Sequence, residues 1–200
     1  KKRDEKKKIL AFDISSKKKI ILVSLKKNIT NSEAENLGAN FYDQFKSNTI
    51  NEFNLESETL SIKQKNILGH FTHGIKLKSY TFEKYKTKKN NKNILITITG
   101  KNQPSLKDKT KFRAIEDGTF YTRDLVSEPG NILHPDEYAK RLNSLRKHGL
   151  KVTVYDEKKL KKLGMNTLLG VGQGSVRGSY LVTMEWNGLS KKSKPLAFVG

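Results

Sequence analysis

This 200-residue chain contains two histidines, His70 and His73, whose side chains and spacing are those of possible metal ligands. Three residues apart, they would share one face of a helix, a spacing that metal ligands can use. A catalytic metal site needs a third protein ligand, often a carboxylate, and the chain has no HExxH-type motif. We therefore expect the two histidines to be polar surface near the end of an amphipathic helix.

A glycine-rich segment, residues 170–174 (GVGQG), resembles the start of a dinucleotide fingerprint. That fingerprint follows a strand and opens a helix whose N-terminus meets the pyrophosphate. Here the pattern predicts a short helix before the glycines and a strand after them. Because this context is inverted, we expect a structural loop over residues 170–178 and no nucleotide site.

A basic stretch, residues 76–92, interleaves Tyr80, Phe82 and Tyr85 with seven lysines. Aromatic rings among positive charges can form a stacking platform for single-stranded nucleic acid. In the alternative, the rings anchor a loop in the core while the lysines face water. We favour the alternative.

The charge of the chain invites a nucleic-acid interpretation, since 40 lysines and arginines against 20 acidic residues give a net charge of +20. Only six of the basic residues are arginine, the side chain favoured for bidentate recognition of bases and phosphates. We therefore favour a biased composition over a dedicated binding surface. The absence of cysteine excludes disulfides and thiolate metal sites, and no GxSxG motif indicates a serine hydrolase. No apolar run approaches the roughly 18–20 residues that span a bilayer.

The elements that must position these residues alternate between strands and helices. Thr30 and Glu33 have capping-box spacing, and residues 50–62 are ambiguous. The apolar patterns predict strands at 9–14, 20–25, 93–100, 151–155, 180–186 and 196–199. They predict helices from Thr30, around 67–75, along 106–125, over 135–149 and over 156–163, with a linker at 101–108. We expect an α/β fold with a largely parallel sheet.

Four segments resemble the leucyl (cytosol) aminopeptidase family, in the order in which the family carries them. They are residues 80–87 (YTFEKYKT), 121–133 (YTRDLVSEPGNIL) followed by Pro135, 162–175 (KLGMNTLLGVGQGS) and 181–188 (LVTMEWNG). The resemblance covers roughly residues 67–200. It implies an N-terminal mixed α/β domain over 1–101 that lacks its start, a linker and connecting helix over 102–128, and the first αβ units of the catalytic domain over 129–200.

The resemblance also implies an activity and its cofactors. Members remove N-terminal residues, preferably leucine, from peptides by means of a water activated between two divalent ions, manganese or zinc. In the family, the strand matched by residues 196–200 runs directly into a KGVTFDTGG segment that supplies the first metal ligands. All ligands would therefore lie downstream of Gly200, so we assign no catalytic, metal or substrate-binding residue and expect the 200-residue chain alone to be inactive.

The family resemblance further implies a homo-hexamer in the cytoplasm that acts on peptide substrates and does not involve a membrane. A different class of function stays open beside it. The alternative is a basic nucleic-acid-binding module, or a DNA-binding accessory role of the same protein.

Overall fold

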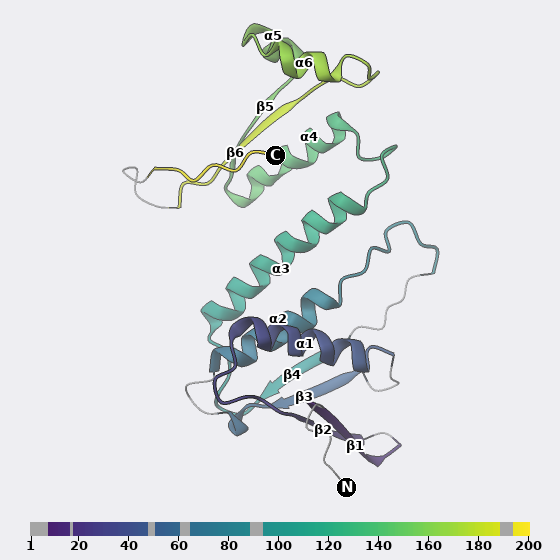
Figure 1. The fold of residues 1–200 in the computed structure, drawn as a ribbon, viewed down its shortest axis with the longest axis vertical. Helices are drawn as coiled ribbons and strands as arrows, with labels where there is room; N and C mark the ends of the chain where they lie inside the picture. The colour runs from purple at the N-terminus through teal and green to yellow at the C-terminus, as the bar shows by residue number, and fades with distance from the viewer. Residues whose placement is uncertain (1–7, 17, 48–50, 61–64, 89–93, 189–193) are drawn as a thin grey trace. The chain divides into compact units, whose positions relative to one another are not determined.

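A computed structural model describes residues 8–16, 18–47, 51–60, 65–88, 94–188 and 194–200. The chain divides into two compact units, Lys1–Ser127 and Glu128–Gly200 (Figure 1). Among the described residues, no helix is both long and apolar enough to cross a membrane.

The strands of the first unit form two separate pairs. β1 (Ile9–Ser15) and β2 (Lys18–Val23) make an antiparallel hairpin, which confirms the two strands predicted at the start of the chain. The ambiguous segment contains β3 (Glu52–Glu56), which pairs in parallel with β4 (Leu95–Thr99), followed by the short 3-10 helix Ser57–Thr59. Parallel strands need a crossover, and the second helix of the unit lies in this one.

Two helices cover these strands. α1 (Asn31–Phe45) begins at the predicted capping box, since the Thr30 hydroxyl accepts from the Glu33 backbone and the Glu33 side chain accepts from the Thr30 backbone. α2 (Lys65–Lys78) confirms the second predicted helix. The core between helices and strands is built on Leu37, Phe41, Phe45, Phe71 and Ile75.

Two glycines let α1 and α2 approach closely. A Cβ atom on Gly38 would lie 2.0 Å from the backbone oxygen of Phe71, and one on Gly74 would lie 2.0 Å from that of Glu35. Any side chain at either position would therefore push the two backbones apart.

The long helix α3 (Leu106–Ser127) ends the first unit. It begins inside the segment predicted as a linker, because the Ser105 hydroxyl accepts from the Asp108 backbone N–H at 3.1 Å and caps the first turn. None of its residues is fully buried, so α3 lies on the surface of the unit and meets α2 along one side.

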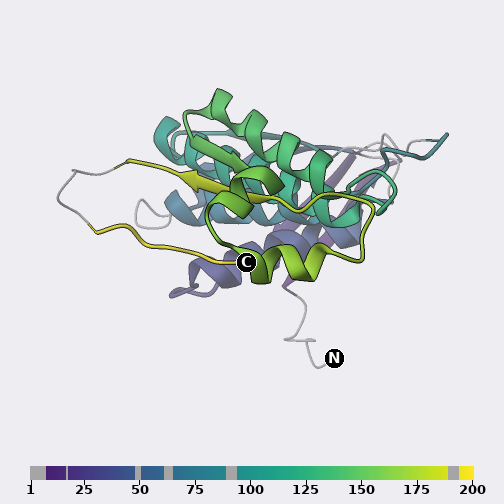
Figure 2. The ribbon, with the colours of Figure 1, turned by 90° about the horizontal axis from the view of Figure 1, so that it is seen from above.

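The second unit starts with α4 (Pro135–Asn143), whose last turn tightens into the 3-10 helix Ser144–His148 and stops at Gly149, with φ of 87°. The predicted helix over 135–149 is thus confirmed, although only its first part is α-helical. It is followed by β5 (Lys151–Tyr155), α5 (Glu157–Lys162), α6 (Asn166–Gly172) and β6 (Leu181–Glu185). α4 lies along the β5–β6 pair (Figure 2).

The α/β class is confirmed, but the expected largely parallel sheet is wrong. In the part of the chain that the structure describes, three two-stranded sheets form, and β3–β4 is the parallel one. β5 and β6 pair in an antiparallel manner, with Tyr155 at the end of β5 opposite Leu181 at the start of β6. The connection through α5 and α6 therefore begins and ends at the same end of the strand pair. The predicted strand at 196–199 is also wrong, since this segment is exposed and has no partner strand among the described residues.

Candidate functional site

The two candidate metal ligands, His70 and His73, each bind a carboxylate from a neighbouring helix. Nδ1 of His70 lies 2.6 Å from Oε1 of Glu35 on α1. Nδ1 of His73 lies 2.7 Å from Oε1 of Glu116 on α3. The ring of Phe112 lies 4.9 Å from both imidazole rings. The pair therefore joins α2 to α1 and to α3.

This arrangement corrects the expectation that both histidines are surface residues. The His73 side chain is only 5% exposed, and a buried polar group needs a partner. Sequence reasoning missed Glu35 and Glu116 because they lie 35 and 43 residues from their histidines. Across the described residues, no three metal-ligating side chains gather at one point.

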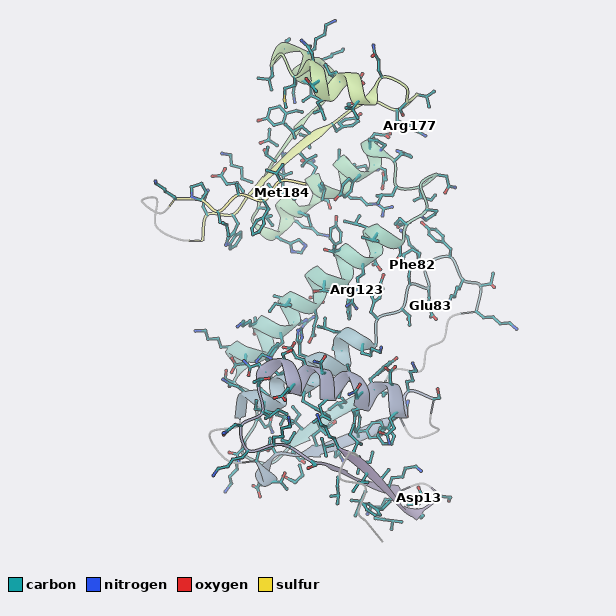
Figure 3. All side chains as sticks on the ribbon, in the orientation of Figure 1. Asp13, Phe82, Glu83, Arg123, Arg177 and Met184 are labelled. Atoms are coloured by element: carbon teal, nitrogen blue, oxygen red, sulfur yellow. The ribbon has the colours of Figure 1, made fainter. Side chains whose placement is uncertain are left out.

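In the basic aromatic segment, Tyr80 is fixed against α3. Its hydroxyl donates to Oδ1 of Asp124 at 2.7 Å, and its ring lies 5.3 Å from that of Phe120. The guanidinium of Arg123, which is labelled in Figure 3, lies 5.4 Å from the Tyr80 ring. Burial raises the pKa of Tyr80, and the hydrogen bond to Asp124 raises it further. Two of the segments that resemble the family, 80–87 and 121–133, are thus held together by direct contacts.

The other two rings of this segment, Phe82 and Tyr85, contact each other at 5.8 Å. Phe82 is partly buried, whereas Tyr85 is 51% exposed and has the Lys84 ammonium 5.6 Å from its ring. The prediction that the rings anchor the segment is confirmed for Tyr80 and only in part for the other two. Tyr80 packs on α3 and the other rings pack on each other, so the three form no continuous stacking surface.

A cleft of about 750 Å³ opens between α1, the C-terminal half of α2 and Arg123 of α3. Asp43 accepts from Nζ of Lys46 at 2.8 Å and lies 3.0 Å from Nζ of Lys78, and these contacts lower its pKa. Arg123 donates to the backbone oxygen of Leu77 at 2.7 Å. The cations beside the cleft are therefore bound by the protein itself, and its lining contains neither histidine nor cysteine.

The glycine-rich segment does not form the loop expected from Gly170 onward, because α6 continues to Gly172. The glycines thus lie at the end of a helix, where the helix dipole is negative and disfavours phosphate. A Cβ atom on Gly172 would lie 2.0 Å from Oγ of Ser179, so the lack of a side chain at Gly172 leaves room for Ser179. The backbone N–H of Ser179 donates to Glu157 at 3.1 Å. These contacts give the segment a structural role within the second unit.

Ion pairs hold the first helix of the second unit. Asp136 in the first turn of α4 contacts His134 and lies 3.4 Å from Arg177, which is labelled in Figure 3. Arg141 donates to Glu128, a buried carboxylate, at 2.8 Å. The hydrogen bond to Glu128 raises the pKa of Arg141. These side chains stabilise the unit and form no nucleophile–base pair.

The fold of the chain is the one found in leucine aminopeptidase and a related maturation enzyme. The bottromycin maturation enzyme BotP in complex with Mn superposes with a TM-score of 0.73 at 19% identity, over 90% of this chain and 39% of that one. A mutant of tomato leucine aminopeptidase superposes with a TM-score of 0.74 at 18% identity, over 88% of this chain and 37% of that one. At these identities the likeness shows the fold alone, an α/β fold.

Sequence comparison identifies the family. Residues 120–200 match the catalytic domain of the cytosol aminopeptidase family. The probable cytosol aminopeptidase of Agrobacterium fabrum is 46% identical over 137 residues, which are 65% of this chain and 28% of that protein. The corresponding protein of Brucella ovis is 48% identical over 134 residues, 64% of this chain and 27% of that one. The chain belongs to the cytosol aminopeptidase family, and it spans less than a third of the length of these relatives.

Proposed function

We propose that this chain is the N-terminal portion of a leucyl aminopeptidase-like exopeptidase that removes N-terminal residues, leucine preferred, from peptides. The match of residues 120–200 to the family's catalytic domain supports this proposal. We assign residues 1–101 to an N-terminal α/β domain, 102–128 to a linker and connecting helix, and 129–200 to the start of the catalytic domain.

We also propose that the whole protein uses two divalent ions, manganese or zinc. When bound, such ions would activate a water for attack on the first peptide bond and would offset the negative charge that develops there. The described residues do not fit such a site, because no three ligands gather and both candidate histidines already bind carboxylates. We therefore place the ligands downstream of Gly200 and derive no catalytic step from residues 1–200. The manganese in the BotP structure supports the use of divalent metal ions.

The family name of the relatives supports a cytoplasmic location. The assembly is proposed to be a homo-hexamer acting on peptide substrates, without insertion into a membrane. Size-exclusion chromatography with light scattering on the full gene product would test the hexamer, which requires six times the mass of one chain.

The activity is tested by comparing the full gene product with residues 1–200 on leucine 4-nitroanilide. With manganese or zinc, we expect release of nitroaniline by the full product, loss of activity in a chelator and recovery when metal returns. Residues 1–200 should release nothing. Activity of the short chain would contradict the placement of the ligands, whereas an inactive full product would contradict the aminopeptidase proposal.

A further inference from the structure

The hairpin β1–β2 is apolar on both faces. Its inward residues Ile9, Ile21 and Val23 pack against the core of the first unit. Directly opposite residues of an antiparallel pair share a face, and Leu10 lies opposite Leu22 as Phe12 lies opposite Ile20. Five large apolar side chains of the hairpin are each between 43 and 56% exposed: Leu10, Phe12, Ile20 and Leu22 on this outward face, and Ile14 at the register shift beside the turn.

The neighbouring pair β3–β4 shows what a solvated outward face looks like in the same unit. β2 lies beside β3, since Ile21 and Val23 line one hollow together with Phe53 and Leu55 (Figure 1). The inward residues of β3–β4 are likewise apolar, but its outward positions are almost all polar: Glu52, Asn54, Glu56, Leu95, Thr97 and Thr99. A strand pair with one solvated face normally alternates in this way. The hairpin therefore departs from its neighbour on its outward face alone.

The dimensions of the outward face suit one helix. Strands of six and seven residues are about 20 Å long at about 3.3 Å per residue. Two strands side by side, with their side chains, cover a strip about 10 Å wide, which matches the diameter of an α-helix. α1 and α2 already cover the inward face of the strands, so helices are the elements that pack against this layer.

The charges on the hairpin indicate which kind of helix would bind to its outward face. The alternation that places Leu10 and Leu22 outward also places Lys8 and Lys18 outward, one at each end of the strip. Among the hairpin residues that the structure describes, no outward position carries an acidic residue; Asp13, labelled in Figure 3, pairs with Lys19 near the turn. A second copy of this chain would bring the same lysines and a net charge of +20, so like charges would meet.

We propose that the outward face of β1–β2 is a docking surface for an amphipathic helix of a partner protein, with aliphatic side chains along one side and carboxylates at both ends. The aliphatic side, spaced at i, i+3, i+4 and i+7, covers the five exposed apolar side chains. The carboxylates lie near Lys8 and Lys18 and fix the position of the helix along the strip. This inference does not rest on the proposed peptidase activity.

The test uses a fluorescent synthetic helix of about 18 residues with leucines along one side and glutamates at both ends. We expect saturable binding by fluorescence anisotropy. Phe12→Thr and Ile20→Thr, made separately, should each weaken binding about tenfold, because each removes a large apolar contact. Threonine suits an exposed strand, so both variants should keep the wild-type circular dichroism spectrum and melting temperature.

The matched control is Leu95→Thr, which removes an exposed apolar side chain from the outward face of β3–β4 and should leave binding unchanged. A helix with lysines at its ends should bind more weakly than the glutamate version at low salt. Equal binding of a scrambled peptide, or equal binding by Phe12→Thr, would overturn the proposal. So would a dimer of the chain that Phe12→Thr abolishes, or tighter binding to phosphatidylserine vesicles than to the peptide.

Discussion

Oε1 of Glu116 on α3 lies 2.7 Å from Nδ1 of His73 on α2, and both side chains are largely buried, at 14% and 5% exposure. α3 contributes no fully buried residue of its own to the first unit. The contacts that hold it to α2 include this pair, the packing of Phe112 on the imidazole ring and the hydrogen bond from Arg123 to the backbone oxygen of Leu77. The histidine that first suggested a metal ligand has a structural role.

His73→Leu should destabilise the first unit by about 1–3 kcal/mol, because Glu116 would remain largely buried without its partner. Urea denaturation followed by circular dichroism measures the change. The control is Asp117→Asn on α3, next to Glu116, which removes an exposed contact to Arg113 at 4.0 Å and should cost less than about 0.5 kcal/mol. Equal effects of the two substitutions would contradict the structural role of His73.

Gly74→Ala should destabilise the first unit by about 1–3 kcal/mol, since the added Cβ atom would meet the Glu35 backbone oxygen at 2.0 Å and force α1 from α2. Gly118 on α3 provides the control, because a Cβ atom there would meet nothing within 4 Å. Gly118→Ala should stabilise by up to about 1 kcal/mol through helix propensity. Thermal melts of the two variants should therefore shift in opposite directions, and a neutral Gly74→Ala would show that the helices are not in close contact.

Acid should weaken the start of α1. The Thr30 backbone N–H and the Lys26 ammonium hydrogen-bond the Glu33 carboxylate, which lowers the pKa of Glu33 from 4.5 to about 2. Because the folded-state pKa is the lower one, the stabilisation is fully present above pH 4.5 and is lost as the pH falls through about 2. Carbon-13 NMR titration of Glu33 measures the pKa directly.

Glu33→Gln supplies the comparison for this effect. The difference in unfolding free energy between wild type and variant should be constant above pH 4.5 and shrink as the pH is lowered toward 2. A titration of Glu33 at its ordinary pKa would show that the capping box does not persist in solution.

The charge of +20 predicts weak, sequence-independent binding of duplex DNA at low salt that disappears near about 0.15 M salt. Lys84 lies beside Tyr85, and Lys158 lies on α5. Lys84→Ala should lower the affinity for DNA no more than Lys158→Ala does. Anisotropy titrations at several salt concentrations measure both effects. Binding that survives physiological salt and depends on Lys84 would instead identify the basic aromatic segment as a dedicated nucleic-acid site.

Local signals predicted much of the fold. The capping box located the start of α1, and β-branched runs located β1, β2 and β4. Gly149, with its positive φ, marked the end of the helical segment that begins at Pro135. Each of these features depends on residues within a few positions of one another, which is why the sequence alone indicated them.

Features that depend on distant residues were not predictable in this way. No local pattern links His73 to Glu116, 43 residues away, or Tyr80 to Asp124, 44 residues away. The apolar run at 196–199 satisfied the strand pattern, but a strand also needs a partner, and none lies among the described residues. For the candidate site, the residues themselves indicated no catalytic group, and the family resemblance supplied the activity.

We propose that this chain leads into the catalytic residues of a cytosol aminopeptidase. Sequencing the transcript beyond the codon for Gly200 tests this proposal most directly. We predict that Lys-Gly follows at once and that a Phe-Asp-x-Gly-Gly segment comes within the next few residues. A stop codon, or a continuation without that segment, would contradict the claim.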